Sequence, residues 1–234
     1  MLELKNITKV IGDKLILRNF SLTLARGESV AVIGPNGAGK STFFKLAVGL
    51  MQPTSGEIHL NQAQIKKKSL LLQKKIGYLG HESFLYNALT PRENLVFYGK
   101  LYKVKNIEEK VANLLKEVGL HYFKDIPIRS FSRGMMQRLA IARVLLADPE
   151  YLFLDEPHTG LDQEAVSLLN RLIEERQREG IGILLISHDF EQVVSVCERV
   201  LVLNKGRIIE ERQIDSEEGL MPFKNWYEAV VSGK

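Results

Sequence analysis

The sequence predicts an α/β fold with a mostly parallel sheet, interrupted in its middle by a helical insert. Two observations support this prediction. Short apolar strands alternate with helical segments in the first and last thirds of the chain, which is the pattern of a parallel sheet. Between them, from about residue 81 to residue 147, the apolar residues recur at helical spacing instead.

The first third is predicted to form strands that lead into one loop and helix. Leu2–Ile7 and Phe20–Leu24 alternate apolar and polar residues, as half-buried strands do. Ser29–Ile33 is almost entirely apolar, which is typical of a strand buried on both faces. A glycine-rich turn follows, and Ser41–Leu50 is predicted to be a helix. A strand, a glycine loop and a helix in this order form one nucleotide-binding unit.

The middle of the chain contains an amphipathic helix. Val111, Leu114, Leu115 and Val118 have the spacing of residues on one helix face. Pro91 is expected at the first turn of another helix, where the missing N–H of proline costs nothing.

The last third returns to alternating strands and helices. The expected strands are Tyr151–Leu154, Ile181–Ile186, Val200–Leu203 and Arg207–Glu210. The expected helices are about Asp162–Glu179, a segment from Phe190, and a tail within Ser216–Lys234. The aromatic residues expected to anchor that tail on the core are Phe223, Trp226 and Tyr227.

Composition limits the class of protein. A chain of 234 residues, 45% apolar and 26% charged, suits one large soluble domain or two closely joined subdomains. A formal charge of +4 demands neither nucleic acid nor anionic lipid as a partner. Cys197 is the only cysteine, which excludes an internal disulfide and favours an intracellular protein. Residues 1–5 lack a signal-peptide core and no run approaches roughly 18 apolar residues, so we expect any membrane role to need another chain.

The glycine-rich turn matches the spacing G-x-x-x-x-G-K-[ST]. Glycines let backbone N–H groups point at phosphate oxygens, and the following helix adds the positive end of its dipole. Lys40 would reach the β- and γ-phosphates, and the Ser41 hydroxyl would bind Mg²⁺. The flanking strand and helix count against an accidental glycine turn. The predicted nucleotide-binding residues of the turn are Gly34, Pro35, Asn36, Gly37, Ala38, Gly39, Lys40, Ser41 and Thr42.

Two adjacent carboxylates follow the strand Tyr151–Leu154. The strand delivers Asp155 to its carboxyl end, where α/β sheets bind ligands, and Asp155 can hold Mg²⁺ directly or through water. Glu156 can polarise an attacking water as a general base. By itself such a pair is more often a helix cap, but the phosphate loop upstream makes the chemical interpretation the better one.

Three further segments have the order and spacing of one family. Phe131–Arg138 resembles the signature segment of ABC ATPases, Thr159–Asp162 resembles their D-loop, and Ile186–Asp189 resembles their switch-histidine segment. The resemblance covers essentially the whole chain. It implies a P-loop NTPase core of the ABC ATPase type with an N-terminal antiparallel β-subdomain. The expected division is 1–80 and 148–215 for the core, 81–147 for a helical signature subdomain and 216–234 for a helical tail.

The resemblance also implies residue roles and partners. Ser132, Arg133 and Gly134 would face ATP bound to a second ATPase subunit, a copy of this chain or a homologue, across a head-to-tail dimer. Asp162 would link the two sites, and His188 would act in catalysis at the γ-phosphate. The implied cofactors are ATP and Mg²⁺. The implied partner is an integral-membrane transporter subunit, which would hold the chain on the cytoplasmic face of the cell membrane; no nucleic acid is expected.

The sequence departs from the family pattern at several positions. Arg133 and Met135 replace the usual Gly and Gln of the signature. His81 replaces a Gln that senses Mg²⁺ and the membrane partner, which makes it a candidate metal ligand. Ile11 replaces the aromatic residue that stacks on adenine, so that only an apolar contact is expected. His81 with the Ser-Arg-Gly-Met signature resembles haem exporters of the cytochrome c maturation type, although such signatures also occur in exporters of drugs, polysaccharides or ions.

Two other classes of protein remain as alternatives. A soluble ABC ATPase acting on DNA or ribosomes would carry a long coiled-coil insertion or a second cassette, and this chain has neither. A P-loop kinase would need an acceptor pocket and a lid, and has no use for a signature segment. The sequence therefore predicts the ATP-hydrolysing subunit of an ABC transporter, favours an exporter, and leaves the direction of transport and the substrate open.

Overall fold

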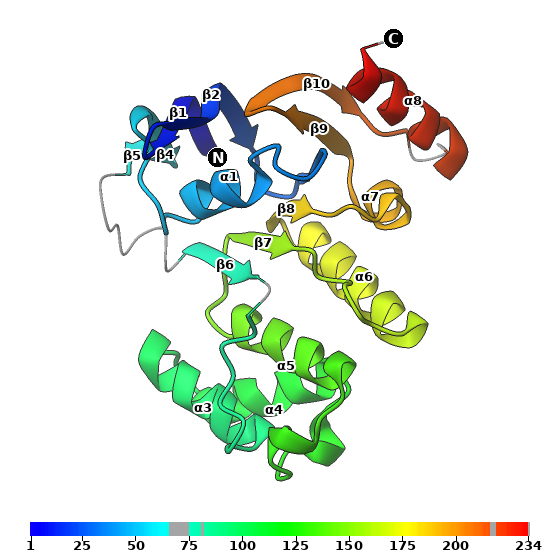
Figure 1. Cartoon of the computed structure of the whole chain (residues 1–234). Helices are drawn as coiled ribbons and strands as arrows, with labels where there is room; N and C mark the ends of the chain where they lie inside the picture. Colours follow the sequence, from blue (N-terminus) through cyan, green and yellow to red (C-terminus); the bar gives the residue numbers. More distant parts are fainter. Residues whose placement is uncertain (66–74, 81, 216–218, 234) are drawn as a thin grey trace.

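The computed structural model describes residues 1–65, 75–80, 82–215 and 219–233. Six strands form its central sheet: β3 (Ser29–Ile33), β6 (Ile76–Leu79), β7 (Tyr151–Asp155), β8 (Gly182–Ile186), β9 (Arg199–Asn204) and β10 (Arg207–Gln213). Their order is β10-β9-β3-β8-β7-β6 (Figure 1). Every neighbouring pair is parallel except β9 and β10. The predicted mostly parallel sheet is confirmed.

A second, antiparallel sheet forms the N-terminal part. It contains β1 (Leu2–Ile11), β2 (Lys14–Leu24), β4 (Ser55–Leu60) and β5 (Ala63–Gln64), in the order β2-β1-β4-β5. Helix α1 (Lys40–Ala47) lies between the two sheets. Its Phe43 and Phe44 are fully buried, with ring centroids 4.7 Å from Phe20 of β2 and 5.5 Å from Phe153 of β7. The N-terminal antiparallel subdomain that the resemblance implied is therefore confirmed.

The middle of the chain forms a helical layer beyond the β6 edge of the sheet (Figure 1). It contains α3 (Pro91–Tyr102), α4 (Ile107–Glu117), α5 (Arg133–Leu145) and the 3₁₀ turns η1 (His121–Phe123) and η2 (Ile128–Ser130). Pro91 is the first residue of α3, where Thr90 and Glu93 form a reciprocal capping box. The predicted apolar face of α4 is buried and packs into the largest core cluster.

The described part of the chain also contains the helices α6 (Gln163–Arg178), α7 (Phe190–Val196) and α8 (Leu220–Ser232). Aromatic rings attach α8 to the rest of the protein. The Phe190 ring of α7 lies 5.6 Å from Phe223 and 4.9 Å from Tyr227, between centroids. The Arg212 guanidinium of β10 lies 3.9 Å from the centroid of Trp226. The expected anchoring of the tail by these aromatic residues is confirmed.

Some boundaries differ from the predictions. The helix expected over Ser41–Leu50 ends at Ala47, because the chain leaves helical conformation at Gly49, which has a φ of 75°. β4 was not predicted, since only its Ile58 and Leu60 are buried and its apolar pattern is short. Within the described residues, no helix combines the length and the apolar character that a membrane span requires.

Candidate functional site

The predicted phosphate loop curls between the end of β3 and the start of α1. Gly34, Gly37 and Gly39 have φ values of 153°, 78° and 109°, which L side chains rarely adopt. Gly34 also lies against the backbone of β9, since a Cβ there would stand 2.0 Å from the Leu203 carbonyl oxygen. The loop therefore needs glycine both for its conformation and for this close approach.

Lys40 is folded back over this loop. Its Nζ donates to the carbonyl oxygens of Gly34 at 2.7 Å and Pro35 at 3.2 Å. Burial lowers the pKa of Lys40, while the negative charges of Glu156 and Asp155 oppose that shift. Lys40 also begins α1, and the N–H groups of a first helical turn have no acceptor within the helix. A cation and a helix N-terminus thus meet at one place, as a phosphate site requires.

The two predicted carboxylates lie at the carboxyl end of β7. Asp155 is its last residue and is buried. Glu156 has a φ of 51°, and its N–H donates to the Ile186 carbonyl of β8 at 2.8 Å. The Glu156 Oε2 lies 2.6 Å from His188 Nδ1 and accepts from the His188 backbone N–H at 3.3 Å. This contact joins the chain segments that follow two neighbouring strands.

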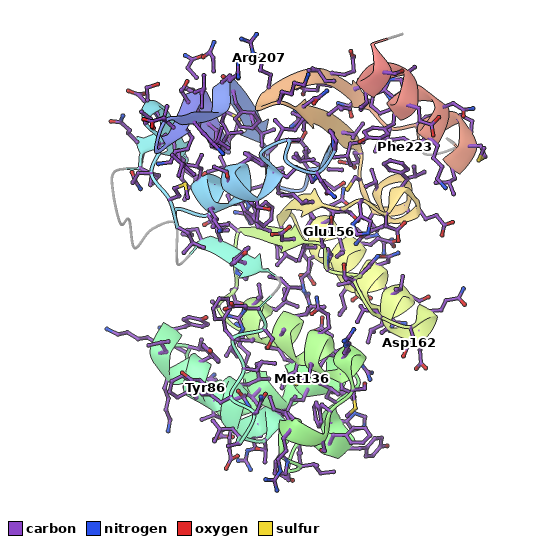
Figure 2. The ribbon with its side chains drawn as sticks, viewed as in Figure 1. Tyr86, Met136, Glu156, Asp162, Arg207 and Phe223 are labelled. Carbon is purple, nitrogen blue, oxygen red and sulfur yellow. The ribbon has the colours of Figure 1, made fainter. Side chains whose placement is uncertain are left out.

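One open cleft of about 580 Å³ collects these side chains. β3, β8 and β7 are adjacent and parallel, so their carboxyl ends meet at one edge of the sheet, where Figure 2 shows Glu156. The structure thus brings together residues that the sequence places far apart. The lining residues are Ile16, Asn36, Gly37, Ala38, Gly39, Lys40, Ser41, Thr42, Asp155, Glu156, Thr159, Ile186 and His188.

The apolar lining of the cleft includes a residue that sequence reasoning missed. Ile11, the predicted adenine contact, ends β1 with 46% of its surface exposed and does not line the cleft. Ile16 in β2 of the same hairpin is partly buried and does line it. Nothing in the sequence distinguishes Ile16 from its apolar neighbours Leu15 and Leu17. The contact of Ile11 with a base stays a prediction.

The signature segment lies at the start of α5, outside the lining of the cleft. Ser132 caps this helix, with its Oγ accepting from the Met135 N–H at 3.2 Å. Ser132 and Arg133 are exposed, whereas Gly134 is buried. In Figure 2, Met136 of α5 lies within the helical layer, away from Glu156 at the sheet.

The D-loop packs directly against the signature segment. A Cβ at Gly134 would stand 4.0 Å from Asp162 Oδ2, and one at Gly160 would stand 3.5 Å from Arg133 Nη1. Asp162 caps α6, since its Oδ1 accepts from the Ala165 N–H at 2.8 Å. The four residues predicted to act across a dimer therefore lie together and are not among the residues that line the cleft of their own chain.

Ser41 and Asp155 are the candidate Mg²⁺ ligands that the structure describes. They line the cleft from α1 and β7, and hydroxyl and carboxylate oxygens suit this ion. In the described part of the chain, no group of three or more His, Cys, Asp or Glu side chains could hold a metal alone. Mg²⁺ often takes only one or two protein ligands with phosphate oxygens, so this pair fits it. His81, the third candidate, lies outside the described residues.

Comparisons with known proteins show which family this chain resembles. A family model described as ABC transporter matches residues 17–159. The ABC transporter ATP-binding protein NatA of Bacillus subtilis (strain 168) is 34% identical over 223 residues, which cover 92% of this chain and 91% of NatA. The Nod factor export ATP-binding protein I of Sinorhizobium fredii (strain NBRC 101917 / NGR234) is 36% identical over 212 residues, covering 90% and 62% of the two chains. A dimeric ATP-binding cassette, solved in a post-hydrolysis state bound to ADP and Pi, superposes with a TM-score of 0.81 at 28% identity, covering 92% and 99%.

Proposed function

This chain belongs to the ABC transporter family, and we propose that it works in a head-to-tail ATPase dimer that drives a separate, membrane-embedded exporter subunit. Within the family it is an ATP-binding subunit that hydrolyses ATP. The observation that carries the proposal is the single cleft shared by the phosphate loop, two carboxylates and His188.

We assign one role to each group in the cleft. Lys40 and the loop amides hold the β- and γ-phosphates. Ser41 and Asp155 would hold Mg²⁺, which neutralises phosphate charge when bound. Glu156 accepts the proton of the attacking water, and its contact with Nδ1 orients the His188 ring toward the γ-phosphate.

The dimer is proposed because the signature segment and the nucleotide cleft are separate within one chain. Ser132 and Arg133 are exposed and lie outside the cleft, so a second subunit is needed to bring a signature segment to each nucleotide. The ATP molecules would then lie in the interface, and their hydrolysis would release it. The dimeric state of the superposed ATP-binding cassette supports this arrangement.

The helical layer is the proposed contact surface for the membrane subunit. It exposes an aromatic patch, which we define as Phe84, Tyr86, Phe97, Leu101 and Tyr102, each 38–63% exposed. An apolar patch of this kind indicates an interaction site, and Figure 2 marks it at Tyr86. Export as the direction is supported by the name of the Nod factor relative. Haem as the substrate would depend on His81, which lies outside the described residues.

The dependence of activity on protein concentration tests the proposed dimer. Phosphate release per subunit should rise with protein concentration, because the active species is a dimer. If the activity per subunit stays constant on dilution to a demonstrably monomeric state, the ATP site is not shared between two subunits.

The membrane contact has its own test. Tagged protein extracted from its native membranes should bring down a multi-span protein, and Leu101→Glu should lose it while keeping its ATPase activity in solution. Tyr122→Glu, at a residue 84% exposed and outside the patch, is the matched control and should retain the membrane protein. Equal recovery with both variants would place the contact elsewhere.

A further inference from the structure

Pro157 and His158, the two residues that precede the D-loop and that we call its base, contact two different helices. The carbonyl oxygen of Pro157 accepts a hydrogen bond from Gln137 Nε2 of α5 at 2.9 Å. One residue later, the Nε2 of His158 lies 3.0 Å from Gln192 Nε2 of α7. α5 begins at the signature segment, whereas α7 begins directly after the switch-histidine segment. Two consecutive residues thus connect the signature helix with the switch helix.

His158 is built into the interior as a neutral hydrogen-bonding group. The residue is 9% exposed, and burial lowers its pKa, although Asp189 and Asn170 oppose that shift. Because the amide N–H of Gln192 can only donate, the His158 Nε2 accepts this hydrogen bond. A neutral imidazole that accepts at Nε2 carries its proton on Nδ1, and the side-chain hydrogen bond of His158 with Asn170 of α6 uses this donor. The imidazole then bridges α6 and α7 behind the D-loop.

Backbone hydrogen bonds restrict the conformation of the chain between His158 and Asp162. The Thr159 N–H donates to the Glu156 carbonyl at 3.2 Å, and the Leu161 N–H donates to the His158 carbonyl at 3.1 Å. Asp162 then caps α6. Because these turns are short, a displacement of His158 moves the D-loop as a whole.

We infer that His158 and Gln137 are positioning residues that couple the two ATP sites, an inference that rests on the dimer proposed above. In that dimer, α5 faces the partner's nucleotide and His188 faces the nucleotide of its own chain. α5 contacts the carbonyl oxygen of Pro157, and α7, the helix that follows His188, contacts the side chain of the next residue, His158, so a change at one site is passed through these two residues to the other. Neither residue touches nucleotide.

The test compares variants in the full chain at concentrations where it is dimeric. His158→Leu removes the bridge, whereas His158→Gln keeps a donor and an acceptor. Gln137→Met removes the bond to Pro157 from a partly buried helix position that tolerates methionine. His59→Gln is the control, at a histidine paired with Glu57 on β4.

Three quantities separate positioning from general damage: the Hill coefficient of phosphate release against ATP, kcat, and the ATP affinity of the monomer. We expect His158→Leu and Gln137→Met to lower the Hill coefficient from about 2 toward about 1, the range open to two sites. We expect kcat to fall about tenfold, as small misplacements of catalytic groups do. Monomer ATP affinity should stay within about twofold, and His158→Gln should restore cooperativity.

The outcomes distinguish this inference from the proposed function. If the parent itself shows no cooperativity and no dependence on concentration, the dimer fails, and the inference with it. If the parent is cooperative and Gln137→Met or a folded His158→Leu remains equally cooperative, the dimer stands and the coupling role is overturned. Should His158→Leu fail to fold, Gln137→Met decides alone.

Discussion

Replacement of Glu156 by Gln should stop turnover without loss of ATP binding. Glutamine has nearly the same shape, and a φ of 51° strains both residues alike. Its amide oxygen can still accept from the His188 N–H, but it cannot take a proton from water. Because the His188 side chain is 75% exposed, the contact between Glu156 and His188 that the variant loses stabilises the fold by at most about 1 kcal/mol. The variant should therefore remain folded.

The expected fall in kcat of the Glu156→Gln variant follows from the role of Glu156 as a general base. A positioned general base contributes roughly 10²–10⁴ in rate, which is about 3–5 kcal/mol of activation free energy. We therefore expect kcat to fall about 10³-fold. ATP affinity should hold or improve, since Glu156 is a negative charge at the edge of the phosphate site that already acts on Lys40.

Steady-state phosphate release and calorimetric ATP titration measure these two quantities. Gel filtration with ATP should show a persistent dimer, because the bound nucleotide is no longer consumed. Glu210→Gln, an exposed glutamate of β10, is the matched control and should behave like the parent. Turnover by Glu156→Gln within tenfold of the parent rate would show that Glu156 is not the base.

The remaining predictions concern the loop, the signature and pH. Lys40→Ala should weaken ATP binding at least tenfold in calorimetry, because it removes a charged donor; unchanged affinity would remove Lys40 from the phosphate site. Ser132→Arg should abolish most turnover but leave monomer ATP binding intact, and a loss of monomer binding would contradict action across the dimer. Since the folded pKa of His158 lies below its ordinary 6.5, the unfolded chain binds more protons near that pH. Stability in urea should therefore be full above about pH 6.5 and fall as pH drops toward the folded pKa, less steeply in His158→Gln; equal slopes would refute a buried neutral histidine.

The order of the strands and helices could be predicted because each depends on a pattern of neighbouring residues. Ser29–Ile33 is almost entirely apolar, and the spacing G-x-x-x-x-G-K-[ST] marks the loop that follows it. The β4 strand escaped prediction because two buried residues, Ile58 and Leu60, make no clear alternation. The end of α1 was placed too late because the apolar residues Val48 and Leu50 follow Ala47, whereas the chain leaves the helical conformation at Gly49.

The site was predictable to the extent that parallel strands bring their carboxyl ends to one edge. This rule places Asp155, Glu156 and His188 beside the loop without any knowledge of side-chain contacts. Contacts between distant elements follow no such rule. Neither the Gln137 bond to Pro157 nor the approach of His158 to Gln192 has a sequence signal, because both depend on how α5 and α7 pack around the D-loop.

The docking of α8 gives the protein an intrinsic optical probe. Trp226 is the only tryptophan in the chain, and its ring is stacked on the Arg212 guanidinium, a cation that influences indole emission. The rings of Phe223 and Tyr227 in the same helix pack against Phe190, which lies two residues after His188. Movement of the switch segment should therefore alter the fluorescence of Trp226. The catalytic cycle can be followed in unlabelled protein, in real time, by stopped-flow mixing with nucleotide.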